Sequence, residues 1–139
     1  MLRVAPFKNT NLMDAEARMT VGMIVMENDV PVNKFFPLPL EIRQISTLSL
    51  SWTLVHAIGE DSPFYGFTKE DFDAAEGEVI VQVKAFDDLF STTVAASTSY
   101  TFDEIVYGAK FEIMYAENES KTKTILYLGK LNSFKEVAI

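Results

Sequence analysis

The stretch "DAEARMTVGMIV", residues 14–25, decides the fold because its side chains follow a period of two. Small and apolar side chains fill every odd position: Ala15, Ala17, Met19, Val21, Met23 and Val25. The even positions begin with Asp14, Glu16, Arg18 and Thr20. Successive side chains of a β-strand point to opposite faces, so this alternation predicts a strand with one buried face.

The same period of two recurs along the rest of the chain. We predict further strands over residues 48–58, 79–83, 90–102, 105–115 and 124–128. One helix is expected, because Thr68-Lys69-Glu70-Asp71 resembles a capping box with Asp in place of Glu, and Gly77 ends it after about two turns. Short strands with regular turns predict an all-β, immunoglobulin-like antiparallel β-sandwich (E-set type) with one short helix.

Composition limits the classes of function. With 139 residues the chain fits a single domain over residues 1–139, and with no cysteine it has neither disulfides nor thiolate metal ligands. Its apolar runs are far shorter than the roughly 20 residues that cross a bilayer. The 20 acidic and 12 basic residues give a net charge of −8, which argues against nucleic acid as a partner and favours cations.

His56 is the only histidine, and it shares a strand face with Leu54 and Ile58. This parity predicts a half-buried histidine whose ring bonds the following turn. A serine nucleophile would have only His56 as its base, and no Gly-x-Ser-x-Gly elbow is present. A hydrolase that uses His56 and neighbouring acids remains an alternative.

A cluster of acidic residues covers the predicted helix, and a calcium-binding site is one interpretation of it. Asp71 and Asp73 open like an EF-hand loop, but Ala75 and Glu76 occupy the positions of that loop's third ligand residue and its glycine. We therefore interpret the cluster as a solvated helix face and predict no metal and no cofactor. Its members are Glu70, Asp71, Asp73, Glu76 and Glu78.

Several motifs, in their order and spacing, resemble one family. The strongest match is Leu50-Ser51-Trp52-Thr53, then His56-x-Ile58, then Ser62-Pro63-x-Tyr65-Gly66. Others are Met1-x-Arg3-Val4, Asp14-Ala15 through Arg18, Tyr100, Asp103-Glu104-Ile105, Gly108 and Leu128-Gly129-Lys130. Together they resemble the cytoplasmic C-terminal domain of inward rectifier potassium channels, particularly of the prokaryotic branch, over nearly the whole chain.

The resemblance implies a fold and a function. The family's domain is an immunoglobulin-like sandwich that forms a homotetramer below the membrane, extends the ion pathway and couples regulatory signals to the gate. We therefore expect no enzyme, but a voltage-gated or otherwise regulated potassium channel domain at the cytoplasmic face of the cell membrane. Its expected partners are potassium ions, anionic lipid head groups and the transmembrane pore portion of the same channel, with the chain itself soluble.

The resemblance also implies sites. Asp14 is expected on the ion pathway, and its parity agrees, because Ala15 and Ala17 take the buried face. The turn from Asp87 to Val94 matches the loop that narrows the family's cytoplasmic pore. Its small hydroxyl residues Ser91, Thr92 and Thr93 suit such a constriction. Phe90 and Val94 are expected to anchor that turn in the sandwich.

Further expectations concern lipid and packing. Arg3 and Lys8 are expected to face lipid head groups or the linker to the pore. The loop residues His56, Ser62, Pro63 and Tyr65 are expected to serve a subunit interface or a structural loop.

Two departures from the family pattern concern charge. Lys84 stands where many eukaryotic members place an acid on the pore wall, and Ser97 replaces an arginine near the gating loop. Strong block by polyamines is therefore not expected. The main alternative function is a free-standing β-sandwich that binds a protein or another ligand.

Overall fold

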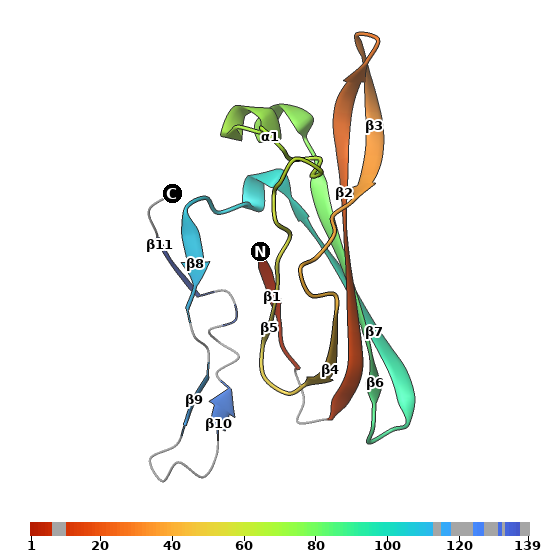
Figure 1. The fold of residues 1–139 in the computed structure, drawn as a ribbon, viewed down its shortest axis with the longest axis vertical. Coiled ribbons are helices and arrows are strands. Elements are labelled where there is room, and N and C mark those ends of the chain that lie inside the picture. Colours follow the sequence, from red (N-terminus) through yellow and green to blue (C-terminus); the bar gives the residue numbers. More distant parts are fainter. Residues whose placement is uncertain (7–10, 113–114, 118–123, 127–130, 132, 137–139) are drawn as a thin grey trace.

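The computed structural model describes residues 1–6, 11–112, 115–117, 124–126, 131 and 133–136 (Figure 1). Antiparallel strands make up most of it. In chain order the elements are β1 (Leu2–Val4), β2 (Leu12–Glu27), β3 (Val30–Pro37), β4 (Gln44–Leu48), β5 (Trp52–Leu54), α1 (Lys69–Ala75), β6 (Glu78–Asp87), β7 (Thr92–Thr101), the 3₁₀-helix η1 (Phe102–Glu104), β8 (Ala109–Phe111), β9 (Tyr115–Glu117), β10 (Thr124–Leu126) and β11 (Phe134–Glu136).

The largest sheet has five strands and is built around β2. Its order is β3-β2-β6-β7, and β4 pairs with the first part of β2. The predicted strand over residues 14–25 is confirmed and extends from Leu12 to Glu27. Its predicted inner face is also confirmed, because these side chains are at most 8% exposed: Ala15, Ala17, Met19, Val21 and Met23.

A β-bulge at Asp14 interrupts the regular register of β2. Met13 lies opposite Phe86, whereas Glu16 lies opposite Lys84, so β2 carries one extra residue in between. Asp14 has φ +51°, in the left-handed region that residues other than glycine rarely adopt. The alternating pattern did not predict this bulge.

The predicted long strand over residues 48–58 is wrong as a continuous element. β4 ends at Leu48 and pairs with β2, whereas β5 runs from Trp52 to Leu54 and pairs with β1. Residues 49–51 carry the chain from one sheet to the other. The predicted parity holds for Leu48, Trp52 and Leu54, which are all buried, but it fails at Ile58, which is 56% exposed.

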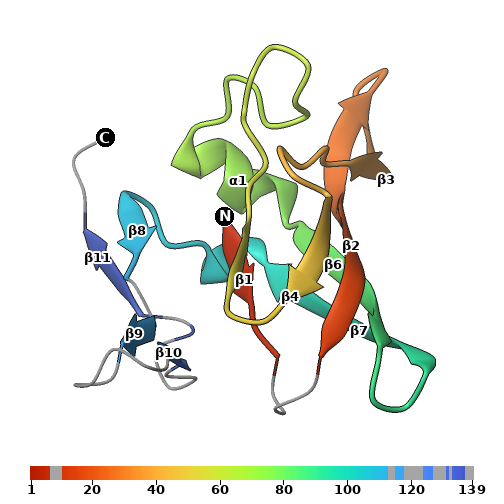
Figure 2. The ribbon, with the colours of Figure 1, turned by 60° about the horizontal axis from the view of Figure 1, so that its bottom comes forward.

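Three two-stranded sheets complete the described fold: β1-β5, β11-β8 and β10-β9. Figures 1 and 2 show the β8–β11 strands on the far side of β1 and β5 from the five-stranded sheet. The predicted strand over residues 105–115 is wrong in its first part, because β8 begins only at Ala109, after Gly108 with φ +63°. Ile113 and residues 127–128 of the last predicted strand lie outside the described residues.

The predicted helix start is confirmed. The Thr68 hydroxyl oxygen accepts a hydrogen bond from the Asp71 backbone N–H at 3.3 Å. The Asp71 carboxylate in turn accepts from the Thr68 backbone N–H at 2.8 Å, which completes the capping box. Aspartate therefore replaces the usual glutamate of the box without loss of either bond.

The helix ends at Glu76, which adopts φ +45°, so Gly77 is not the left-handed residue. A Cβ on Gly77 would lie 2.5 Å from the Phe102 ring and 2.6 Å from the Gly22 carbonyl oxygen. Close packing therefore explains this glycine.

Aromatic rings fill the space between α1, η1 and the loop before the helix. Phe72 of α1 lies 5.0 Å from Phe64 and 5.3 Å from Phe102, measured between ring centroids. The predicted fold class, an antiparallel all-β sandwich with one short α-helix, is confirmed in the described residues. Neither of their two helices has the length and apolar character needed to cross a membrane.

Candidate functional site

The hairpin between β6 and β7 is held by Asp87. This carboxylate is 6% exposed, and its Oδ1 accepts hydrogen bonds from the backbone N–H groups of Leu89 at 3.0 Å and Phe90 at 3.4 Å. Ser91 completes the turn with φ +50°. Such an Asp turn fixes the loop conformation from a single buried side chain. The sequence contains this signal in Asp87-Asp88, but its role as anchor was not predicted.

The predicted anchoring of this turn by Phe90 and Val94 is wrong. Phe90 is 69% exposed and Val94 is 37% exposed, and Leu89 beside them is 68% exposed. Their apolar side chains leave the core because β7 is the last strand of the sheet and the described residues place no element over it.

The fold brings Asp14 and the hydroxyl residues of the turn to one end of the five-stranded sheet. Met13, next to the bulge, pairs with Phe86, and Phe86 pairs on its other side with Thr93. Asp14 and Ser91 are both exposed and both adopt positive φ. The start of β2 and the β6–β7 hairpin, far apart in the sequence, thus lie at the same end of the sheet, at the bottom of Figure 1.

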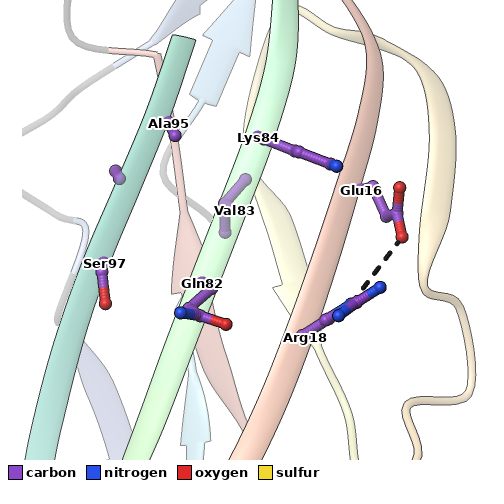
Figure 3. Close-up of a pocket in the computed structure, with 8 residues that line it drawn as sticks. Glu16, Arg18, Gln82, Val83, Lys84, Ala95 and Ser97 are labelled. Carbon is purple, nitrogen blue, oxygen red and sulfur yellow. Dashed lines mark ion pairs between the residues drawn. The ribbon is translucent and has the colours of Figure 1, made fainter.

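A shallow groove lies on the outward face of the same three strands, with a volume of about 360 Å³ (Figure 3). Two cross-strand rows line it. One row is Glu16, Lys84 and Ala95, and the other is Arg18, Gln82 and Ser97.

Side-chain length and charge shape this groove. Long side chains stand on β2 and β6, whereas the small Ala95 and Ser97 on β7 leave the hollow. Glu16 and Arg18 form an ion pair at 4.0 Å. Lys84 makes no ion pair with any described residue, so the groove carries a net positive charge beside the exposed Asp14.

His56 is held between two loops. Its Nδ1 lies 2.7 Å from the Pro39 carbonyl oxygen, and its Nε2 lies 2.7 Å from the Ser62 hydroxyl. A carbonyl only accepts, so in the neutral ring Nδ1 carries the proton and Nε2 accepts from Ser62. The Ser62 oxygen also accepts from the Phe64 backbone N–H at 3.1 Å.

These bonds confirm that the ring of His56 bonds the following turn. They also weaken the hydrolase alternative, because a carbonyl occupies the place where a catalytic triad has a carboxylate. Of the other loop residues, Pro63 is partly buried and Tyr65 is 59% exposed.

The position of Arg3 contradicts the expectation that it faces lipid head groups, whereas the alternative, that it faces the linker to the pore, stays a prediction. It is 8% exposed, and its guanidinium donates to the carbonyl oxygens of Leu131, at 3.0 Å, and of Glu112. The group also lies over the Phe111 ring, 4.5 Å from its centroid. Arg3 therefore joins β1 to the chain around β8, and a buried group with these contacts does not face a lipid surface. Lys8 lies outside the described residues.

The acidic face of α1 affects the ionisation of Tyr107. The centroid of the Tyr107 ring lies 6.1 Å from that of the Phe72 ring. Burial, and then the charges of Asp73 and Glu70, raise the pKa of Tyr107 above its ordinary value. Within the described part of the chain, no three His, Asp or Glu side chains are placed to hold a metal ion.

The chain belongs to the family described as the inward rectifier potassium channel C-terminal domain, which matches residues 1–138. It is 29% identical over 139 residues to the inward rectifier potassium channel Kirbac3.1 of Paramagnetospirillum magnetotacticum, covering 99% of this chain and 46% of that protein. It is 36% identical over 70 residues to the human inward rectifier potassium channel 4, covering 50% of this chain and 16% of that protein. The predicted resemblance is thereby confirmed.

The chain spans less than half the length of these curated relatives. The family is one of potassium channel domains, which is not a class of enzyme. Both relatives are named as inward rectifier potassium channels, and neither name supports the expected voltage-gated attribute.

Proposed function

We propose that this chain is the cytoplasmic regulatory domain of an inwardly rectifying potassium channel. Four copies form a ring below the transmembrane pore of the same channel, extend its ion pathway and couple regulatory signals to its gate. The chain acts as a channel part and not as an enzyme. Family membership over residues 1–138 supports the class of protein, and the geometry of the sheet end supports the site.

The observation that carries the proposal is the position of Asp14 and the β6–β7 turn at the same end of the five-stranded sheet. Four exposed carboxylates around an axis would raise the local concentration of potassium ions. The neighbouring Ser91, Thr92 and Thr93 carry small hydroxyl side chains that let four backbones approach an axis and offer oxygens to a partly dehydrated cation. The Asp87 carboxylate fixes the conformation of the turn through its two hydrogen bonds to the backbone.

Lys84 adds positive charge to the proposed ion pathway. It pairs across the sheet with Glu16 in the groove that opens beside Asp14. Four lysines near the axis oppose the entry of multivalent cations more strongly than that of potassium, since Coulomb energy scales with the charge of the ion. We therefore propose weak block by polyamines. Contact with anionic lipid rests in this proposal on Lys8 alone.

The test is a charge reversal of Asp14 in a complete channel that carries this domain. Asp14→Lys should lower single-channel potassium conductance and weaken block by internal cations, because four positive charges replace four negative ones. Asp29→Lys is the matched control, since Asp29 is also an exposed aspartate with positive φ but lies at the far end of β2, in the turn before β3.

Equal conductance in the two variants would remove Asp14 from the ion pathway. Light scattering and chemical crosslinking of the same channels should show four subunits. A closed dimer would contradict the proposed ring, and assembly without any potassium current would favour a free-standing binding module.

A further inference from the structure

Strand β7 is exposed along its whole length. All ten residues from Thr92 to Thr101 are exposed, on both faces of the strand. Among the described strands β7 is the edge of its sheet, and its register with β6 runs through ten pairs without a shift. An edge strand presents a row of unpaired N–H and C=O groups that can pair with another extended chain.

The opposite edge of the sheet is protected in ways that β7 is not. β3 contains Pro31 and Pro37, which cannot donate to a new strand, and Lys34, which pairs with Glu27. Prolines and lysines are common devices against edge-to-edge association. The β7 sequence "TTVAASTSYT" contains no proline and no charged residue, and its ladder contains no bulge.

Charge indicates what covers this edge. With a net charge of −8, copies of this chain repel each other wherever their acidic surfaces approach. A ten-residue surface without any charge is where that repulsion is smallest, and interface centres are generally depleted of charged residues. Val94 and Tyr100, 37% and 38% exposed, add apolar and aromatic area to it.

We propose that the free edge of β7 is covered by a second copy of this chain, through backbone pairing of an extended segment. The proposal rests on the assembly described under the proposed function and names where neighbouring copies meet. Since β3 is protected, the pairing segment comes from another element of the neighbour. Contacts between unlike surfaces of this kind allow a ring to close.

Hydrogen exchange of the whole chain at low and high protein concentration tests the proposal, with light scattering on the same samples. As the mass rises, exchange of the β7 amides should slow by about tenfold or more. Ser99→Lys places a charge within the pairing edge, beside the neutral Ile80. It should abolish both the slowing and the rise in mass.

Ser46→Lys is the matched control, because Ser46 is an exposed serine of β4, and it should behave as the wild type. If Ser99→Lys loses its melting transition, Thr98→Asp on the opposite face of β7 takes its place. The proposal is overturned if the chain remains monomeric at every concentration. It is also overturned if the mass rises while β7 exchange stays constant, although a tetramer would then still support the proposed function.

The absence of native cysteines allows a second measurement. Under mild oxidation a Ser99→Cys chain should form little disulfide dimer, because each introduced thiol faces a different element of the neighbouring copy and not that copy's own thiol. Near-complete linkage of the introduced thiols to each other would mean that β7 pairs with β7 in a two-fold dimer. That result would overturn the heterologous pairing and contradict the four-fold ring, while the exchange data report separately on whether β7 is covered.

Discussion

The guanidinium of Arg3 lies 4.5 Å from the centroid of the Phe111 ring, and it also donates to two backbone carbonyls. Hydrogen bonds to buried charged groups contribute more than ordinary ones. We expect Arg3→Met to lower the free energy of unfolding by at least about 2 kcal/mol, because it leaves those carbonyls without their donor. Urea unfolding measures the change.

Arg18→Met is the control for this prediction. The Arg18 side chain is 72% exposed and only reaches Glu16 at 4.0 Å, so its loss should cost less than about 1 kcal/mol. Equal losses in the two variants would show that the contacts of Arg3 do not stabilise the fold.

Asp87→Ala should destabilise the β6–β7 hairpin by about 1–2 kcal/mol, because two turn N–H groups lose their acceptor. Asp87→Asn keeps an acceptor oxygen and should recover most of that loss. The neighbouring Asp88→Ala provides the comparison, since Asp88 is exposed and its backbone N–H alone bonds Asn11. A fall in melting temperature of the same size for Asp88→Ala would contradict the anchoring role of Asp87.

Thr92→Trp should strongly reduce potassium current in a complete channel without changing the melting temperature of the domain. Thr92 is exposed at the start of β7, so the larger side chain crowds the proposed axis and leaves the core unchanged. Patch-clamp recording of correctly assembled channels measures the effect. Thr53→Trp, exposed on β5, should conduct normally, and a wild-type current through Thr92→Trp would exclude this turn as the gate.

The raised pKa of Tyr107 predicts how the stability of the fold changes at alkaline pH. Its pKa is raised in the folded state by burial and by Asp73 and Glu70, so the folded chain holds the phenolic proton more tightly than the unfolded chain. This contribution is fully present below the unfolded pKa of about 10 and is lost as the pH rises through the folded pKa. Tyr107→Phe should therefore lose less stability above about pH 10 than the wild type, as measured by urea unfolding across pH.

The charge on α1 offers an internal check of that prediction. Asp73→Asn keeps the phenol but removes one of the two carboxylates that raise its pKa, so the alkaline loss of stability should be smaller than in the wild type. A loss that is the same in the wild type, Tyr107→Phe and Asp73→Asn would assign the pH dependence to other groups.

Local patterns predicted the elements that local physics determines. The alternation from Ala15 to Met23 identified β2, and the spacing of Thr68 and Asp71 identified the start of α1, because each depends on residues close in sequence. The His56 bond to the next turn was predictable for the same reason.

Local sequence patterns could not predict features that depend on residues far apart in the chain. The partners of Arg3 lie 109 and 128 residues away. The exposure of β7 depends on what lies over it, since a strand alternates identically whether or not its faces are covered. The bulge at Asp14 uses a positive φ, which aspartate adopts only occasionally, so the alternating pattern gives little warning of it.

The bond from Arg3 to Leu131 also bears on how the chain folds. The pairing partner of β1, β5, lies some 50 residues later, at Trp52–Leu54, and the carbonyl that Arg3 bonds follows 128 residues after it. Contacts between residues distant in sequence form more slowly than local ones, because a long loop must close first. We therefore expect β1 to dock after the local hairpins have formed, with its guanidinium in water until that docking.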